Sequence, residues 1–405
     1  MTDVEELFRE AVAEPPPSRL VAGEIYAAGR RRHRRRTVSA ATAAVVAGLL
    51  MVGGGLLLPG GSSQGLPPAD EPATATPSED PIQWAEAFDA AHLYLARMAC
   101  PDRKCPKTVF QVRGSDDGGR TWTDRGEPID VYELSVAAAE TLLASVNTGS
   151  GGTRLLTAST DGGRTWRRLH EALTVDAVPS GSVPVCWARS GEPCTLWSVD
   201  PVAGRMAPLR DQPALVPTHD ELLPVRWSGR IWVRGSDPVT GRPAVAASAD
   251  AGRTWSVHVF ADAPPCPSEG CLPIYFALGS QTAYVVTVGA SARAVYRYTS
   301  DGRWERVSGA ERVPADRLGA GGPSFVAADG THVLCETVTQ PSGLDGDRFW
   351  AARDGTYKPV ELRGLPATVY PIKRTQDGWL YTHSYTDQRL YGSTDGWTWS
   401  AIAAG

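Results

Sequence analysis

The chain has 405 residues, 42% of them hydrophobic, which is enough for one large domain with a substantial core. Its 40 basic and 45 acidic residues give a net charge of −5. Because residues 1–36 carry a net charge of +2, the remainder carries −7. We expect no nucleic-acid partner, because the one strong basic cluster, residues 30–36, directly precedes an uncharged run of membrane-spanning length.

Residues 1–36 form a short polar segment that we expect to be a cytoplasmic tail. Val4–Val12 has the pattern of an amphipathic helix that stops at Pro15–Pro17, and a second short helix could run over residues 18–28. Neither helix is long enough to bury a core. A tail of this size suggests that it docks a partner protein.

The strongest charge cluster, Arg30–Arg36, directly precedes an uncharged run over residues 37–58. At about 1.5 Å per helical residue this run spans roughly 33 Å, enough for a bilayer core. Flanking arginines stay on the cytoplasmic side. The run is longer than the apolar region of a signal peptide, and no Ala-x-Ala cleavage site follows it. Residues 37–58 are therefore predicted to form an uncleaved transmembrane helix with the N-terminus inside.

Residues 59–81 are rich in proline, acidic and small polar residues, which predicts an extended stalk without a core. The folded domain is expected over residues 82–405. Only four of the forty basic residues are lysine, a bias typical of a high-GC bacterial genome. These features together predict a single-pass protein of the bacterial cytoplasmic membrane with an extracytoplasmic main domain.

One octapeptide pattern, Ser-x-Asp-x-Gly-x-Thr-Trp, recurs along this domain. It occurs in full at residues 115–122, 159–166 and 248–255, and in shortened form at 299–304 and 393–399. The pattern positions are Ser115, Asp117, Gly119, Thr121 and Trp122; Ser159, Asp161, Gly163, Thr165 and Trp166; Ser248, Asp250, Gly252, Thr254 and Trp255; Asp301 and Trp304; and Ser393, Asp395, Thr398 and Trp399. Short alternating runs precede the copies, for example at 108–112, 154–158 and 294–298. Alternation that ends in an Asp/Gly cluster predicts a β-hairpin.

The aspartates of successive copies are 44, 89, 51 and 94 residues apart. Each long interval is close to two periods and therefore predicts a degenerate copy. The candidates are Leu196–Arg205, with Asp200, and Phe349–Tyr357, with Asp354. Propeller blades of four strands take about 40–50 residues. Seven anchors thus predict an all-β, seven-bladed β-propeller of four-stranded antiparallel blades, with six blades as the alternative.

The octapeptides resemble the Asp-box, or bacterial neuraminidase, repeats of sialidase-like β-propellers. In that family the boxes lie on the outer rim, between the third and fourth strand of a blade and away from any active site. The resemblance implies structural roles for Asp117, Asp161, Asp250, Asp301 and Asp395. A calcium loop is the alternative, but it would need several spaced oxygen ligands per copy. We therefore expect no metal and no cofactor.

All seven cysteines lie beyond the predicted membrane helix. Six pair by closeness, Cys100 with Cys105, Cys186 with Cys194, and Cys266 with Cys271. Such short loops suit local disulfides made in an oxidising compartment. Zinc binding is the weaker alternative, because no histidine has ligand spacing to these pairs. Cys335 is left over in a strand-like run and is expected to be a buried thiol.

Because the octapeptides resemble those of sialidases, we ask whether the active-site residues of a sialidase are present as well. That family carries an Arg-Ile-Pro motif, further arginines that bind a carboxylate, a Tyr–Glu nucleophile pair and an Asp acid/base. Here no Arg-Ile-Pro is present, and the nearest string is Gly229–Trp232. Tyr275, Tyr298 and Tyr381 are possible nucleophiles, but the sequence pairs none of them with a glutamate. We identify no catalytic residues.

The favoured function is a noncatalytic binding or sensing module, with a protein or glycan ligand at the funnel of the propeller. Other Asp-box propellers, such as sortilin-like receptors and photosystem assembly factors, bind peptides or help to assemble membrane complexes. A cell-surface glycoside hydrolase is one alternative. A scaffold that assembles envelope components is another.

Overall fold

The computed structural model of the chain describes residues 81–99, 109–147, 154–188, 193–218, 222–263, 274–288, 293–313, 324–339, 345–353, 356–367, 369, 371–384 and 386–403. These residues belong to one compact unit, which comprises 75–267 and 271–405. The predicted tail, membrane helix and nearly all of the predicted stalk lie outside the described residues. Within the described ranges, no helix is long and apolar enough to cross a membrane.

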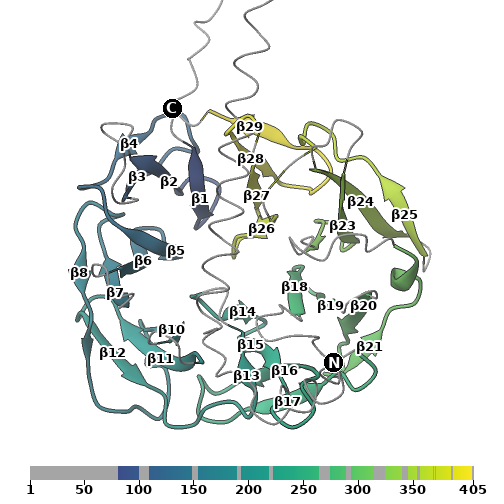
Figure 1. Ribbon diagram of the computed structural model, residues 1–405, viewed down its shortest axis with the longest axis horizontal. Helices are drawn as coiled ribbons and strands as arrows, with labels where there is room; N and C mark the ends of the chain where they lie inside the picture. Colours follow the sequence, from purple (N-terminus) through teal and green to yellow (C-terminus); the bar gives the residue numbers. More distant parts are fainter. Residues whose placement is uncertain are drawn as a thin grey trace, which may run out of the picture. The chain divides into compact units, whose positions relative to one another are not determined.

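Seven β-sheets, called blades 1–7 in chain order, are arranged as a ring (Figure 1). This confirms the all-β, seven-bladed propeller and excludes the six-bladed alternative. Blade 1 contains β1 (Ile82–Ala87), β2 (Leu93–Ala99), β3 (Val109–Ser115) and β4 (Thr123–Asp124). Blade 2 contains β5 (Val131–Ala138), β6 (Thr141–Asn147), β7 (Arg154–Ser159) and β8 (Arg167–Arg168). Neighbouring strands in both blades are antiparallel.

The remaining blades follow the same plan with two exceptions. Blade 3 contains β9 (His170–Glu171), β10 (Val183–Trp187), β11 (Thr195–Asp200) and β12 (Arg205–Pro208). Blade 4 contains β13 (Val216–Pro217), β14 (Val225–Trp227), β15 (Arg230–Ser236), β16 (Pro243–Ser248) and β17 (Ser256–Val259). Blade 5 contains β18 (Ile274–Leu278), β19 (Ala283–Val288), β20 (Arg293–Tyr298) and β21 (Trp304–Arg306), and the short 3-10 helix η1 (Ala310–Arg312) follows. Blade 6 contains β22 (Phe325–Val326), β23 (His332–Thr339), β24 (Asp345–Arg353) and β25 (Thr356–Val360). Blade 7 contains β26 (Lys373–Arg374), β27 (Leu380–His383), β28 (Leu390–Ser393) and β29 (Ser400–Ile402).

Blades 3 and 4 are the two exceptions. In blade 3 the outer strand β9 pairs parallel with β12, unlike the antiparallel blade predicted from the sequence. In blade 4 the inner strand is split, since β13 and β14 both pair with β15. The chain between them reaches blade 3, where the Leu222 carbonyl accepts a hydrogen bond of 2.9 Å from the Cys186 amide of β10. Blade 4 therefore covers an edge of blade 3.

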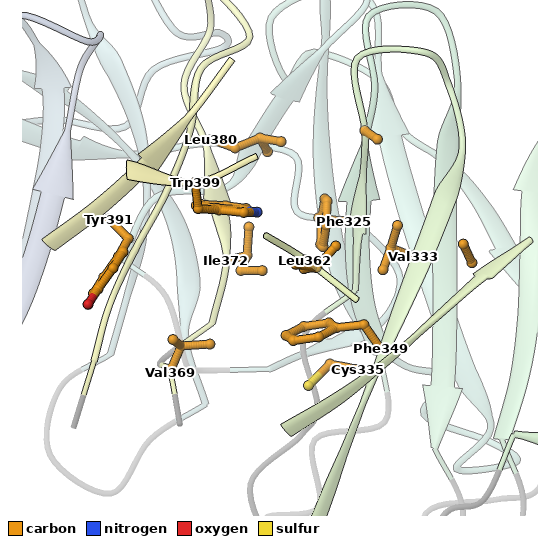
Figure 2. Close-up of a cluster of buried hydrophobic side chains, with 12 residues drawn as sticks. Phe325, Val333, Cys335, Phe349, Leu362, Val369, Ile372, Leu380, Tyr391 and Trp399 are labelled. Carbon is orange, nitrogen blue, oxygen red and sulfur yellow. The ribbon is translucent and has the colours of Figure 1, made fainter. Parts of the chain in front are cut away.

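Buried side chains form the layers between adjacent blades, which we call seams. All six residues of β16 are buried, whereas the outer strands β4 and β8 are exposed. The middle strands are covered on both faces by neighbouring blades, so they read as continuous apolar runs. Figure 2 shows the seam between blades 6 and 7, where Phe349 and Trp399 pack among aliphatic side chains.

The ring is closed by side chains from its two ends. Blade 1 begins with β1, and blade 7 consists entirely of the last four strands of the chain. Across the described residues, no backbone–backbone hydrogen bond joins these two blades. Instead, apolar side chains of β1 and β2 pack against Trp379, Tyr381 and Leu390. The closure that the sequence left open is thus made without a shared sheet.

Candidate functional site

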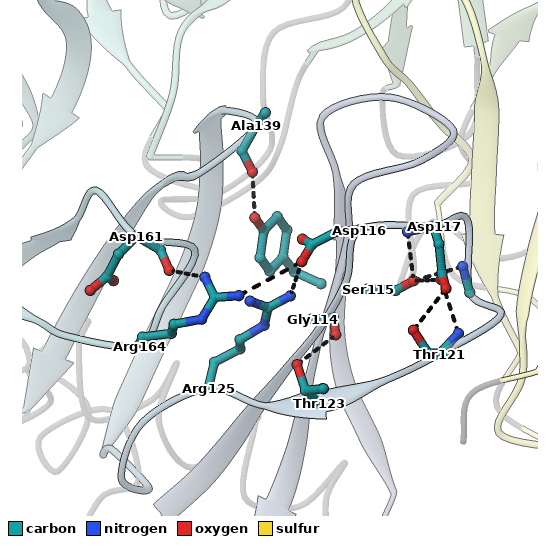
Figure 3. Close-up of polar contacts among 12 residues, drawn as sticks. Gly114, Ser115, Asp116, Asp117, Thr121, Thr123, Arg125, Ala139, Asp161 and Arg164 are labelled. Atoms are coloured by element: carbon teal, nitrogen blue, oxygen red, sulfur yellow. Dashed lines mark hydrogen bonds and ion pairs between the residues drawn. The ribbon is translucent and has the colours of Figure 1, made fainter.

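The first octapeptide turn is built around the carboxylate of Asp117 (Figure 3). Its Oδ1 accepts hydrogen bonds from the Ser115 hydroxyl at 2.8 Å and the Thr121 amide at 2.9 Å, and its Oδ2 accepts one from the Thr121 hydroxyl at 2.7 Å. The Ser115 oxygen accepts a hydrogen bond of 2.8 Å from the amide of Gly119, whose φ of 87° favours glycine. Every partner lies within the octapeptide, so the turn is specified locally.

The other full copies repeat this geometry at the same position, between the third and fourth strands of their blades. The equivalent residues are Ser159, Asp161, Gly163 and Thr165 in blade 2, and Ser248, Asp250, Gly252 and Thr254 in blade 4. Hydrogen bonds from the amide and hydroxyl of Thr121 lower the pKa of Asp117 to about 2. Those from Thr254 lower the pKa of Asp250 to about 2 as well. These carboxylates are occupied by their own turns.

The shortened copies keep the aspartate but change its partners. Asp395 accepts hydrogen bonds from the Ser393 hydroxyl at 3.0 Å and from the Thr398 amide at 2.8 Å. Asp301 accepts one from the Arg303 side chain at 2.6 Å. The degenerate copy in blade 3 lies between β11 and β12, where Asp200 Oδ1 accepts a hydrogen bond of 2.8 Å from the backbone. Asp354 lies outside the described residues.

The tryptophans of the turns contact neighbouring blades. Trp122 Nε1 donates to the Ala403 carbonyl of blade 7 at 2.5 Å, and Trp255 Nε1 donates to the Asp211 carbonyl after blade 3 at 3.0 Å. Trp166 and Trp304 pack partly buried against seam residues, and Trp399 is buried. Each turn is therefore linked to the adjoining blade by its aromatic ring.

A buried arginine connects the first two turns (Figure 3). The side chain of Arg125 is 2% exposed, and its Nη2 lies 2.7 Å from Asp116 Oδ2. Arg164 of the second turn approaches the same carboxylate, with its Nη2 3.7 Å away. A Cβ at Gly114 would lie 2.5 Å from Arg125 Nε, so glycine leaves the space that the guanidinium occupies.

Of the predicted disulfides, Cys186–Cys194 is present and joins β10 to β11, with Cα atoms 5.4 Å apart. The pairs Cys100–Cys105 and Cys266–Cys271 lie outside the described residues. Cys335 is a buried thiol on β23, as predicted.

Two of the tyrosines considered as nucleophiles, Tyr298 and Tyr381, have hydrogen-bond partners in the fold, and Tyr275 lies partly buried on β18. The Tyr381 hydroxyl donates to Glu86 Oε2 at 3.2 Å, and Lys373 Nζ contacts Glu86 Oε1. Tyr381 is only 4% exposed and stacks on Trp379, so a substrate cannot reach it. The Tyr298 hydroxyl accepts a hydrogen bond of 3.1 Å from Arg230. A Tyr–Glu pair therefore exists, but it lies inside the seam that closes the ring.

A second carboxylate on the inner strands is also occupied. Glu133 of β5, in blade 2, accepts a hydrogen bond from the Leu222 amide. Leu222 belongs to the segment of blade 4 that reaches over blade 3, so Glu133 helps to hold this segment in place. Among the described residues, no group of three or more His, Cys, Asp or Glu side chains could hold a metal ion. The sequence could not indicate Glu86 or Glu133, because their partners are far away along the chain.

A shallow cleft lies at the split inner strand of blade 4. Its lining residues are Cys186, Thr218, Leu223, Pro224, Val225, Trp232, Val233, Arg234 and Phe276. The space between its walls amounts to about 300 Å³, which includes open solvent, and a sphere of the size of a water molecule has little room to move in it. A sugar ring does not fit inside it, so a ligand would have to bind across its mouth.

The seam beside this cleft is rich in aromatic rings. Trp232 packs edge-on to Tyr298, Trp304 and Phe276, with ring centroids 5.1, 5.8 and 6.3 Å apart. Trp227 lies on the same side of the β14–β15 hairpin, because residues paired across a hairpin share a face. Its Nε1 donates to the Gly279 carbonyl of blade 5 at 2.8 Å. Its ring orientation is therefore fixed.

No protein-family model matches the chain. No curated protein is similar enough to count as a relative. The similar solved structures include the β-propeller domain of the Trilobed protease from Pyrococcus furiosus, which is 9% identical, covers 80% of this chain and 98% of that one, and has a TM-score of 0.46. YCF48 from Cyanidioschyzon merolae is 11% identical, with coverage of 81% and 97% and a TM-score of 0.44.

A third similar structure is the Penicillium chrysogenum α-L-arabinanase complexed with arabinobiose, which is 12% identical, covers 81% of this chain and 99% of that one, and has a TM-score of 0.38. The identities are low and the TM-scores are below 0.5. These similarities therefore concern the fold alone, and no activity is taken from them.

Proposed function

We propose that this protein is a noncatalytic binding or sensing module whose protein or glycan ligand binds near the centre of the ring. The observation that supports this proposal is the state of the inner carboxylates. Glu86 is held by Lys373 and Tyr381, and Glu133 is held by Leu222. A hydrolase needs two carboxyl groups that face a substrate. Glu86 and Glu133, the glutamates of the inner strands β1 and β5, are both part of contacts between blades.

We further propose that residues 37–58 anchor the propeller at the bacterial cytoplasmic membrane, with the N-terminus inside. The support is the Arg30–Arg36 cluster before an uncharged run of membrane-spanning length. The Cys186–Cys194 disulfide is consistent with an oxidising compartment outside the cytoplasm. Residues 59–81 would then act as the stalk.

The experiment is isolation of the full-length protein from native membranes, followed by identification of what is retained and assay with fluorogenic glycosides. We expect the protein in the membrane fraction, a stoichiometric ligand, and no turnover. Sustained hydrolysis of any glycoside would overturn the noncatalytic assignment. Recovery of the protein only in the soluble cytosolic fraction would overturn the anchor.

A further inference from the structure

The hairpin of β14 and β15 carries two arginines on either side of its tip. Ser228 and Gly229 form the two-residue turn, with φ values of 52° and 70°, and both are exposed. Arg226 precedes the turn and Arg230 follows it. In Figure 1 β14 lies toward the middle of the ring, so the hairpin borders the central opening.

The side chain of Arg226 lies on the face of the hairpin toward blade 3, opposite to Trp227 and Arg230. Its Nη2 donates to the Ser182 carbonyl of blade 3 at 3.2 Å, and no carboxylate contacts it within the described part of the chain. Desolvation lowers the pKa of Arg226. A guanidinium that loses hydration without meeting an anion is destabilised, and a bound anion would reverse this cost.

Arg230 and Trp227 flank the turn on the face toward blade 5. The Arg230 guanidinium donates to the Tyr298 hydroxyl, and it too has no carboxylate partner among the residues described. Trp227 is half-buried and lies edge-on to Tyr298 at 6.0 Å. The hairpin tip thus carries two guanidinium groups on opposite faces, neither with a carboxylate partner among the described residues, and a fixed indole ring beside Arg230.

We propose that this tip, residues Arg226, Trp227 and Arg230, is a docking surface for an acidic protein segment. The inference rests on the proposed binding function and names the class of its ligand. Tryptophan, tyrosine and arginine are the residues that contribute most to protein–protein binding. Carboxylates of Asp and Glu form strong charge-assisted hydrogen bonds with guanidinium groups. The two guanidinium groups lie on either side of the turn, which fits an extended acidic segment that crosses the tip.

The test uses full-length protein in detergent micelles and a hexaglutamate peptide that carries one photo-crosslinking group. Crosslinked residues are mapped by mass spectrometry, which separates the hairpin from the Arg30–Arg36 cluster, the other arginine-rich segment. We expect crosslinks at β14–β15 that weaken with salt. The double variant Arg226→Gln/Arg230→Gln should lower their yield by about tenfold or more, since each lost charged hydrogen bond costs about 1.5 kcal/mol, or about tenfold.

The matched control is Arg210→Gln, which removes an exposed guanidinium that is paired with Asp176. This variant should leave the hairpin crosslinks unchanged, and Arg226→Lys should retain part of them because it keeps the charge. Crosslinks found only at Arg30–Arg36, or unchanged in the double variant, would overturn the proposal. So would competition by oligogalacturonate but not by unlabelled hexaglutamate. None of these outcomes would affect the membrane isolation or the glycoside assay, so the two proposals fail separately.

Discussion

Two seams, one between blades 1 and 2 and one between blades 7 and 1, each contain a buried charged side chain. In the first seam the charged groups come from the outer turns of the blade, and in the second from the inner strands. In the first, Arg125 meets Asp116, nine positions away along the chain, at the outer turns. In the second, Glu86 on an inner strand meets Lys373 and Tyr381, 287 and 295 positions away. Between consecutive blades 1 and 2, the charged contact is made by residues of neighbouring turns. Between the first and last blades, it is made by inner-strand residues that are far apart along the chain.

The two centres also differ in how far they depend on one partner. Arg125 is fully enclosed, and its Nε and Nη1 have no hydrogen-bond partner among the described residues, so Asp116 alone balances it. The Glu86 side chain is 11% exposed and has two donors, and its partner Lys373 is 40% exposed. Water can replace a partner at the closing seam but not at Arg125. The loss of one partner should therefore matter more between blades 1 and 2.

Among single substitutions at neutral pH, the largest effect is expected for Asp116→Asn. The substitution leaves the buried guanidinium of Arg125 without a counter-ion and should lower the free energy of unfolding by about 2–3 kcal/mol. Denaturant unfolding followed by tryptophan fluorescence measures it. As the control, Arg125→Met/Asp116→Asn removes both charges and should recover at least half of the loss. A change below about 0.5 kcal/mol in the single variant would show that the enclosed guanidinium does not need this carboxylate.

A smaller effect is expected for Glu86→Gln in the closing seam. The amide keeps an acceptor for Tyr381, and the half-exposed Lys373 can be rehydrated, so the loss should be about 1 kcal/mol. A double-mutant cycle with Lys373→Met should give a coupling energy of about 0.5–1 kcal/mol. If Glu86→Gln costs more than Asp116→Asn, the ranking of the two seams is wrong.

The most gradual effect is the pH dependence of stability. It involves a third seam, in which the buried group is a neutral histidine. His332 stacks on Tyr284 of blade 5, and burial lowers its pKa to about 3, as it does for His383 in blade 7. A histidine in the unfolded chain titrates near 6.5. Above that pH the stabilisation is complete, and it is lost as the pH falls toward 3, because the unfolded chain then binds protons that the folded chain does not.

Each buried histidine should contribute a slope of about 1.4 kcal/mol per pH unit in this window. Asp117 and Asp250 in the turns have pKa values lowered to about 2. The ionised carboxylates therefore stabilise the folded protein fully above about pH 4, and this stabilisation is lost only as the pH falls to 2. Unfolding midpoints measured from pH 7 to 3 for the protein and for His332→Phe test this. An identical slope in both would mean that His332 takes up its proton at the same pH in the folded protein as in the unfolded chain.

Some elements were predictable because their contacts are local. The octapeptide at residues 115–122 contains all the partners of Asp117, so its hairpin could be predicted from the sequence. The spacing of the copies gave seven blades, and the strands expected at 154–158 and 294–298 are β7 and β20. The Cys186–Cys194 disulfide was predicted from closeness along the chain.

Other features could not be predicted in this way. The parallel strand β9 and the split inner strand of blade 4 break the repeat. The Ser228-Gly229 turn signals a hairpin, but not that β14 shares its partner strand with β13. The candidate site was missed for the same reason. Gly229–Trp232 was noted only as a poor match to a sialidase motif, and the isolated string does not show that Arg226 contacts blade 3 while Arg230 contacts blade 5.

The amino-acid sequence by itself determined the three full turns and indicated seven blades, because each full turn closes its own hydrogen bonds within one octapeptide. Only the tertiary structure decided which side chains meet across the seams. Glu86 finds Lys373 and Tyr381 because the ring brings the first and last blades together. This pairing depends on the packing of residues that are separated by nearly the whole length of the domain, so no local sequence pattern predicts it.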